Sequence, residues 1–494
     1  MNKQNKIFNV AFFQFATSSI HFAASLEILN KECRSGNKTF YSLLGQATCF
    51  PSRMAKMGET LLGKAPRQLK HLIFKADPNV TFKDKIEYNE IWVQKHIEAF
   101  TQQLNKISNI SMLSSLQFDS IKPGAAVANE IITYSKDNNV NLLENQKLVI
   151  FLLRSYLEVY SHTLISIRDN RISRVHIYNG RFLHERASWD AAKRLGCEIL
   201  IFETTHDRYQ QRTEGFHNRV NNQKVMKELW ENSKLEISKK TSEASVWFKD
   251  MRSNVNPFMV KHPKKFISNK KYFVYFSNSD DEVVGFWDEW TEPLGNQFDV
   301  VSKLIEIFSN QNTYELVIRL HPNLLNKPPK IIKKWQSLKT NRNSVLIQSG
   351  EKISSYDLID DCVGVINFGS TIGIEAAYYE KPVLVLADCK YDELEIADKL
   401  FNWDEIDSWI KRAEFLPRDL ISQRKVNSYI FGFYFRACGT QFLNTNLKKT
   451  PNQGAWEADK FLGMKLQEFN FIRNYRKLLS RYKFWKIREV LGFE

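Results

Sequence analysis

The stretch that most constrains the fold is VGVINFGSTIGIEAAYYEKPVLVLA, residues 363–387. A short apolar run is followed by a Gly-Ser-Thr turn, a helical pattern and a second apolar run, which together predict a strand, a turn, a helix and a strand. This is the repeating unit of a buried parallel sheet. The first amides of such a helix point to the carboxyl edge of the sheet. Gly369, Ser370 and Thr371 are therefore predicted to cradle a phosphate group.

Glu375 lies about one helical turn after Thr371. Its carboxylate there is predicted to accept hydrogen bonds from the two hydroxyls of a ribose while the helix start holds the phosphate. The alternative, which the residues leave open, is an ordinary helix cap at Ser370 or Thr371 beside a core helix.

A second turn of the same kind occurs about fifty residues earlier. His321-Pro322-Asn323 directly follows the apolar run ELVIRL. Proline ends a strand because it has no N–H to donate, so His321 is expected at the strand end. An imidazole there can donate a hydrogen bond to a phosphate oxygen, and Arg319 adds positive charge. The alternative is a plain strand end.

The rest of the chain predicts an α/β fold built from two β-α-β series. The expected strands lie at 7–13, 39–43, 173–178 and 198–202 in the first series, and at 271–276, 314–320 and 344–347 in the second. We expect a first domain over 1–255 with a helical insert at about 83–168, a second domain over 270–440 and a helical tail over 441–494. The boundary is placed in the stretch 254–269, which is rich in Asn, Pro and Lys.

Charge and cysteine usage narrow the class of partner. The 494 residues carry 70 basic and 55 acidic side chains, a net charge of +15, which favours anionic partners. The basic residues are dispersed rather than in blocks, so no nucleic acid is expected. The six cysteines form no CxxC pair, which indicates neither a zinc site nor a disulfide framework and suits a reducing cytoplasm. The N-terminal apolar run is interpreted as a first core strand rather than a secretory signal.

Three segments of the sequence resemble a known family. RLHPN followed by NFGSTIGIEAAYYEKPVLVL is similar to the donor half of GT-B glycosyltransferases, above all the bacterial capsule-polysaccharide biosynthesis proteins. Their relatives include Kdo transferases, GT-B sialyltransferases and teichoic-acid glycerophosphotransferases. The resemblance implies that His321, Pro322, Ser370 and Thr371 bind the phosphate of a nucleotide donor, often a cytidine nucleotide. The segment IYNGRFLHERASWDAAKRLGCEILIFET also resembles capsule proteins, at Asn179, Gly180, Arg181 and Glu203.

The resemblance implies two Rossmann-like, doubly wound domains facing a cleft. It also implies an enzyme, a glycosyltransferase that moves a sugar from a nucleotide-sugar donor, with a CMP or other cytidine-linked donor as one option. The acceptor would be a bacterial surface polysaccharide or a lipid-linked saccharide. The nucleotide-sugar is a substrate, and no obligatory cofactor or metal is expected. A glycerophosphotransferase on the same fold and a non-catalytic polysaccharide-assembly protein stay open as alternatives.

Glycosyl transfer also needs a base to take the proton of the acceptor hydroxyl. Glu203, at a strand end, and His21, after the first strand, are the predicted catalytic residues, and Asn179 and Arg181 are expected on the acceptor side. His21 also fits a capping or packing role.

Asp280-Asp281-Glu282 follows the strand KYFVYF and fits a cation site less well than a solvated acidic turn. Residues 471–490 have one apolar and one basic helical face. This pattern predicts a helix that packs on the first domain or lies on an anionic membrane. The expected location is the cytoplasm, with a peripheral position at the inner face of the cytoplasmic membrane as an option.

Overall fold

The computed structural model describes residues 7–14, 19–44, 65–205, 207–213, 215–216, 218–253, 260, 262–279, 291–449 and 456–466. The chain forms two compact units. Unit 1 comprises Met1–Phe216, Gly439–Thr450 and Trp456–Glu494, and unit 2 comprises His217–Cys438 and Pro451–Ala455. The acidic turn at 280–282 and the predicted amphipathic helix at 471–490 lie outside the described residues.

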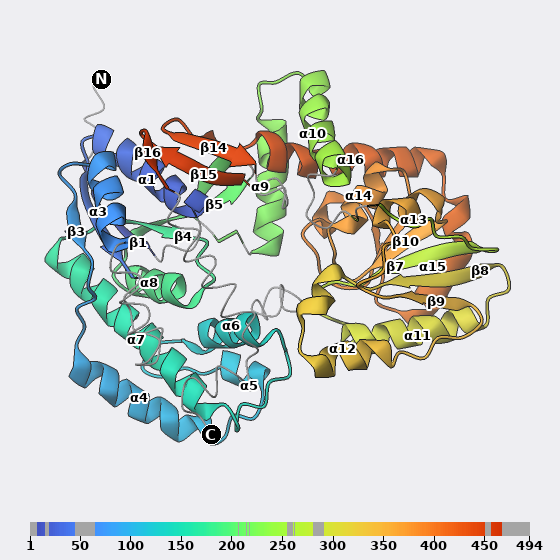
Figure 1. The fold of residues 1–494 in the computed structure, drawn as a ribbon, viewed down its shortest axis with the longest axis horizontal. Helices are drawn as coiled ribbons and strands as arrows, with labels where there is room; N and C mark the ends of the chain where they lie inside the picture. The colour runs from blue at the N-terminus through green and yellow to red at the C-terminus, as the bar shows by residue number, and fades with distance from the viewer. Residues whose placement is uncertain are drawn as a thin grey trace. The chain divides into compact units, whose positions relative to one another are not determined.

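Unit 1 is built on a seven-stranded sheet in the order β13-β6-β5-β4-β1-β2-β3 (Figure 1). Strands β1 to β5 are parallel, and β6 and β13 form an antiparallel edge. The strands are β1 Asn9–Gln14, β2 Lys38–Leu43, β3 Thr81–Lys83, β4 Arg174–Tyr178, β5 Glu198–Thr205, β6 Arg208–Arg212 and β13 Thr440–Gln441.

Helices cover both faces of this sheet. Helices α1 and α3 bury Phe22, Leu26 and Leu72 with Phe12 and Tyr41 on one face, and α8 contacts β1, β4 and β5. The helices of unit 1 are α1 Ser19–Arg34, α3 Ala65–Ala76, α4 Glu90–Leu104, α5 Ile110–Ser114, α6 Gly124–Ser135, α7 Gln146–Asp169 and α8 Leu183–Arg194. The predicted insert at 83–168 contains α4 to α7.

Helix α7 is long and apolar enough to cross a membrane. However, 67% of its most apolar window is buried inside the structure. It also packs along α8 and α4. A core helix of a soluble unit meets the same length and composition test, so α7 gives only weak evidence for a membrane span.

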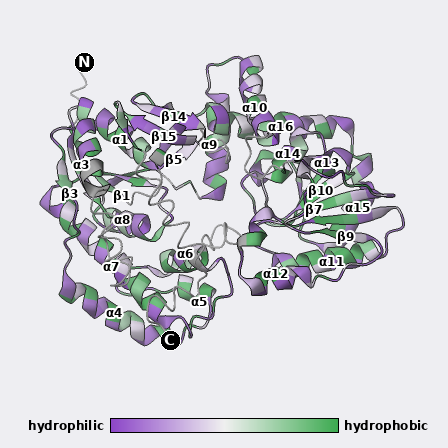
Figure 2. Cartoon of the chain, in the orientation of Figure 1, coloured by the Kyte–Doolittle hydropathy of each residue, from purple (hydrophilic) through white to green (hydrophobic). Residues whose placement is uncertain are grey.

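Unit 2 contains a six-stranded, all-parallel sheet in the order β12-β11-β10-β7-β8-β9. Figure 2 shows these strands mainly in the hydrophobic colour, as expected for a sheet that is covered on both faces. The strands are β7 Lys271–Phe276, β8 Tyr314–Arg319, β9 Ser344–Ile347, β10 Gly364–Asn367, β11 Val383–Val385 and β12 Asp398–Lys399.

The side chains of β7 alternate between two cores. Tyr272, Val274 and Phe276 pack with α9, α10, α13, α14 and α16, whereas Phe273 and Tyr275 pack with α11, α12 and α15. The helices of unit 2 are α9 Arg219–Glu231, α10 Ile237–Arg252, α11 Gln297–Ser309, α12 Pro329–Gln336, α13 Ser355–Asp361, α14 Ile372–Tyr378, α15 Trp403–Arg412 and α16 Arg418–Ala437, with short 3₁₀ helices η2 Pro322–Asn326, η3 Asp392–Leu394 and η4 Ala413–Phe415. The predicted α/β class with two Rossmann-like, doubly wound sheets is confirmed.

Two details of the predicted organisation are wrong. The boundary falls between Phe216 and His217 rather than in 254–269, because Met226, Trp247 and Phe248 of α9 and α10 are buried in the core of unit 2. The predicted helical tail over 441–494 is not helical in its described part. There the chain forms a three-stranded antiparallel sheet of β14 Thr445–Lys449, β15 Trp456–Phe461 and β16 Met464–Lys465.

Candidate functional site

The sheet of unit 2 changes direction between β7 and β10. The chain runs from β7 outward through β8 and β9, then returns to the other side of β7 to form β10, β11 and β12. In open parallel sheets, ligands bind outside the carboxyl ends of the strands at such a switch point. The turns after β7, β8, β10 and β11 all lie at this edge.

His321 is held rigidly after β8. Its backbone N–H donates to Ser277 Oγ at 2.7 Å, and its Nδ1 accepts from the backbone N–H of Asn323 at 3.1 Å. Because Nδ1 acts as the acceptor, the proton of the neutral ring lies on Nε2, which is therefore a donor. Pro322 is the first residue of η2, and the imidazole of His321 caps this helix.

The Ser370 turn is shaped by Asn367. The Oδ1 atom of Asn367 accepts from the backbone N–H groups of Gly369 and Ser370, both at 3.0 Å. These two amides are therefore occupied, contrary to the predicted cradle of helix amides. Thr371 is the N-cap residue of α14, but its side chain makes no capping bond. Within the described residues no hydrogen bond involves the hydroxyl of Ser370 or Thr371, so the turn presents two hydroxyl groups.

The turn after β7 connects these two predicted motifs. Ser277 holds the backbone of His321, and Asn278 Nδ2 donates to the carbonyl of Phe368, one residue before Gly369, at 3.0 Å. Ser277 and Asn278 were not predicted as site residues, although they directly follow the predicted strand KYFVYF. The His321 turn and the Ser370 turn thus share one hydrogen-bonded edge of the sheet.

The structure gives Arg319 and Glu375 other roles than the predicted donor contacts. Arg319 is only 3% exposed and donates to the carbonyls of Gln348 and Glu351, so it anchors the turn after β9. Burial lowers the pKa of its guanidinium. Glu375 is 6% exposed and accepts from the hydroxyl of Tyr356 on α13. Burial raises the pKa of this carboxyl to about 7.

Unit 1 brings together three of the predicted residues at the carboxyl edge of its own sheet. Glu203 Oε1 lies 4.0 Å from His21 Nε2, and Asn179 Nδ2 donates to Glu203 Oε2. The backbone N–H of Thr204 donates to Glu203 Oε1 at 3.0 Å. The side chains of His21 and Glu203 keep 24% and 21% of their exposure, so the pair is accessible to solvent.

Tyr178 is a fourth member of this cluster, and it was not predicted from the sequence. Its ring stacks on His21 with centroids 4.3 Å apart, and its hydroxyl lies 3.1 Å from His21 Nε2. Asn179 and Gly180 both have positive φ, 55° and 75°. A Cβ on Gly180 would lie 2.5 Å from Trp189, so the tight turn needs glycine. Arg181 lies on the same turn, with its guanidinium carbon 5.4 Å from the ring centroid of Phe182.

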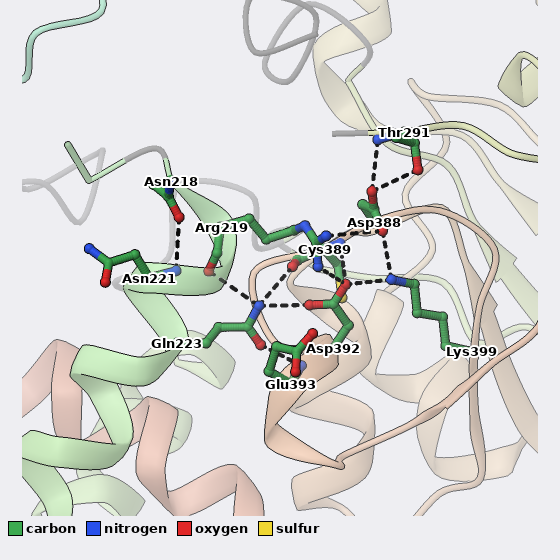
Figure 3. A network of polar contacts seen from close by, with 10 residues as sticks. All are labelled: Asn218, Arg219, Asn221, Gln223, Thr291, Asp388, Cys389, Asp392, Glu393 and Lys399. Atoms are coloured by element: carbon green, nitrogen blue, oxygen red, sulfur yellow. Dashed lines mark hydrogen bonds and ion pairs between the residues drawn. The ribbon is translucent and has the colours of Figure 1, made fainter. Parts of the chain in front are cut away.

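Figure 3 shows a buried ion network around Asp388 and Asp392. It lies next to the Ser370 turn, since a Cβ on Gly369 would lie 2.7 Å from the carbonyl oxygen of Asp388. Asp388, after β11, contacts Lys399 Nζ at 2.6 Å. Asp392 is 2% exposed at its side chain; it contacts Lys399 Nζ at 2.7 Å, pairs with Arg219 and accepts from Gln223 Nε2 at 2.6 Å. Burial by itself raises the pKa of both aspartates, but these cations and hydrogen bonds outweigh it and lower the pKa. These side chains come from three separate segments of the chain, so no local pattern predicts that they meet.

No group of three or more His, Cys, Asp or Glu side chains with suitable geometry to hold a metal ion occurs among the described residues. The five cysteines within the described ranges form no disulfide bond.

Residues 211–402 match the model of the capsule polysaccharide biosynthesis protein family. The resemblance stated from the motifs is confirmed over this range, which contains the His321 turn, the Ser370 turn and the ion network. The matched range lies almost wholly in unit 2, so the similarity to capsule-synthesis proteins concerns that unit. No curated protein matches the chain.

Several solved structures are similar at low level. The beta Kdo 2,4 transferase KpsC of Thermosulfurimonas dismutans is 12% identical, covers 61% of this chain and 87% of its own, and has a TM-score of 0.36. A putative UDP-N-acetylglucosamine 2-epimerase of Listeria monocytogenes is also 12% identical, with coverage of 89% and 93% and a TM-score of 0.28. The calicheamicin glycosyltransferase CalG4 is 10% identical, with coverage of 88% and 100% and a TM-score of 0.28. At these TM-scores the structures carry no weight for function.

Proposed function

We propose that this protein is a nucleotide-sugar-dependent glycosyltransferase acting on a bacterial surface polysaccharide or glycolipid acceptor. The observation that carries the proposal is the edge of the unit 2 sheet, where Ser277 and Asn278 join the His321 turn to the Ser370 turn. Both turns lie at the switch point and within the matched family range. Unit 2 would therefore bind the donor.

In the proposed reaction, negative charge develops on the phosphate of the leaving nucleotide. His321 Nε2–H and the hydroxyls of Ser370 and Thr371 would donate hydrogen bonds to it, in a site already organised before the reaction. Charge-assisted bonds of this kind are stronger than neutral ones. The chemistry assigned to these residues needs no metal, so none is part of the proposal.

Unit 1 would supply the acceptor side. Glu203, oriented by Asn179 and paired with His21, is the proposed base for the acceptor hydroxyl. Arg181, on the neighbouring turn, is proposed to contact the acceptor. We place the protein in the cytoplasm, with access to a lipid-linked saccharide at the inner membrane face, because such acceptors and nucleotide-sugars meet there.

The donor site is tested by nucleotide binding. CMP, CDP, UMP and UDP are titrated into the protein, and His321→Ala and Ser370→Ala are expected to weaken the affinity about tenfold each, the effect of one lost hydrogen bond to a charged group. Both variants should fold, since the Ser277 bond is to the backbone of residue 321. Ser309→Ala, at the end of α11, is the control. Unchanged affinity in both site variants would refute the donor site.

Product analysis separates the alternatives. Sugar transfer from a CMP donor and glycerophosphate transfer from a CDP donor both release CMP, so the mass of the extended acceptor decides between them. Binding without any turnover would favour the non-catalytic assembly role.

A further inference from the structure

Two fully buried side chains fix the backbone of the Ser370 turn. Asn367 and Tyr391 are each 0% exposed. The hydroxyl of Tyr391 donates to the backbone carbonyl of Ser370 at 2.7 Å and lies 3.1 Å from Asn367 Oδ1. Asn367 Oδ1 in turn receives the amides of Gly369 and Ser370. Both the N–H and the C=O of Ser370 are thus held by this pair.

The surrounding glycines show how closely this pair fits. A Cβ on Gly373 would lie 2.2 Å from the Tyr391 hydroxyl and 2.6 Å from Asn367 Nδ2. Gly369 has φ of +83°, and a Cβ there would lie 2.7 Å from the carbonyl oxygen of Asp388. The turn therefore packs directly on the segment from Asp388 to Tyr391, and a shift of that segment must move the turn.

The ion network of Figure 3 holds this segment. Asp392, the neighbour of Tyr391 in the chain, is the point where Arg219, Gln223 and Lys399 converge. Gln223 also receives the backbone N–H of Glu393 at 2.7 Å. Helix α9 and strand β12 thereby fix the backbone on the far side of Tyr391. A buried ionic group that is fully bonded in this way restricts the position of its neighbours.

We propose that Tyr391 and Asn367 are positioning residues for the nucleotide phosphate: they set the backbone of Ser370 so that its hydroxyl and that of Thr371 face the phosphate, and the Asp392 network keeps Tyr391 in place. The inference rests on the proposed donor site, and it assigns a role to residues that lie beneath that site. Both residues would act on the phosphate only through the hydroxyls of Ser370 and Thr371. Their substitution should therefore weaken the binding of ligands that carry a phosphate and spare those that do not.

The test is Tyr391→Phe, which removes a single hydroxyl from a site with no room for rearrangement. CMP and UMP, and the nucleosides cytidine and uridine, are titrated into wild type and variant by calorimetry. We expect the dissociation constant of the better-bound nucleotide to rise about tenfold, as for one lost positioning bond. That of the matching nucleoside should stay within about twofold. A merely structural effect would weaken nucleotide and nucleoside alike.

Tyr272→Phe is the matched control. Tyr272 is also buried in unit 2 and donates to a backbone carbonyl, that of Leu358, at 3.3 Å. It lies at the amino end of β7, away from the carboxyl edge. This variant should leave the ratio of nucleotide to nucleoside affinity unchanged. Hydrogen exchange of the peptide 367–373 should increase in Tyr391→Phe and not in Tyr272→Phe.

Asn367→Asp gives an independent reading. An aspartate keeps the oxygen that accepts from the backbone amides of Gly369 and Ser370, two donors that stabilise a carboxylate. It adds a negative charge beneath the phosphate. We expect a loss of nucleotide affinity larger than in Tyr391→Phe, again with nucleoside affinity retained.

The outcomes distinguish the positioning role of Tyr391 and Asn367 from the donor site itself. If wild type binds a nucleotide and Tyr391→Phe and Asn367→Asp bind it equally well, the positioning role is overturned and the donor site stands. If wild type binds none of the nucleotides, the donor site falls, and the positioning role falls with it. Selective loss of phosphate-bearing ligands in both variants would support the role assigned to them.

Discussion

Glu203 is the residue on which the proposed chemistry depends most. Its carboxylate is oriented by Asn179 and by the backbone of Thr204, and it faces His21 at 4.0 Å. This is the arrangement of a base held by neighbours, but a carboxylate that only supports His21 would look similar. The two roles differ in what an uncharged replacement does.

We predict that Glu203→Gln keeps nucleotide affinity and lowers the transfer rate about 100-fold or more, the usual effect of removing a general base. Initial rates at saturating donor and acceptor measure the change. Glu198→Gln, at the opposite end of β5 and paired with Arg174, is the control. If His21→Ala abolishes transfer while Glu203→Gln retains most of it, His21 is the base and Glu203 its support.

The residues that sequence reasoning found and those that it missed differ in one respect. His321 and Ser370 each occur in a short motif at a strand end, so the local pattern was sufficient to predict that both lie on strand-end turns. Asn367 and Tyr391 act as a pair although they are 24 residues apart in the chain. Their partnership depends on the packing of α14 against the segment after β11, which no local pattern contains.

At the scale of elements, the main error was the secondary structure of the segment that returns to unit 1, which was predicted to be helical and forms strands in its described part. Strands β14 to β16 are short and lysine-rich, TNLKK and WEADKF among them, and they lack the β-branched runs that mark a buried strand. Charged residues of this kind are typical of exposed edge strands. Strands β7 and β9 of the unit 2 sheet have that apolar signature, and their bounds were predicted nearly to the residue.

Glu27, on α1, forms hydrogen bonds with the start of β14. Only 4% exposed, it accepts from the backbone and side chain of Asn444 at 2.7 and 2.9 Å and from the hydroxyl of Thr445 at 2.8 Å. Three bonds to one carboxylate, with the charge buried, make Glu27 a structural residue rather than a base.

We predict that Glu27→Gln destabilises the local fold of unit 1 by about 2 kcal/mol, since an amide accepts through one oxygen only and hydrogen bonds to a charged group contribute this much. Native-state hydrogen exchange of α1 and β14 measures the change without assuming that the two units unfold together. Glu98→Gln, on the exposed face of α4, is the control and should change protection by less than about 0.5 kcal/mol. Equal protection in Glu27→Gln and wild type would show that the strands hold without this carboxylate.

At the scale of the whole molecule, the division into two units, each with a series of parallel strands, follows from patterns spread over hundreds of residues. The boundary did not follow, because helices α9 and α10 are charged and amphipathic and gave no sign of which unit they cover. The burial of Met226, Trp247 and Phe248 in the core of unit 2, where Trp247 contacts Phe431 of α16 and Phe248 stacks on Tyr378 of α14, decides that. The same unit contains two kinds of buried carboxyl group, and these should make its stability depend on pH in opposite ways.

Asp388 and Asp392 have a lowered pKa in the fold, below the ordinary value of 3.8, because their cations and hydrogen bonds outweigh burial. Each contributes stability that is present above the unfolded pKa and is lost as the pH falls through the folded one. Unit 2 should therefore lose this contribution below about pH 4.

Glu375 makes the stability of unit 2 depend on pH in the opposite direction. Burial raises its pKa from 4.5 to about 7, so the unfolded carboxyl ionises first as the pH rises, and unit 2 loses stability between about pH 4.5 and about pH 7. The shift corresponds to about 3 kcal/mol.

Glu375→Gln keeps the acceptor for the Tyr356 hydroxyl and cannot ionise. We predict that it leaves the free energy of opening of α14 nearly unchanged at pH 4.5 and raises it at pH 8 by up to about 3 kcal/mol. Hydrogen exchange of the 372–378 peptide at the two pH values measures this difference. A variant equally destabilised at both values would mean that the carboxyl is held by its contacts alone and that its protonation does not limit the stability of unit 2.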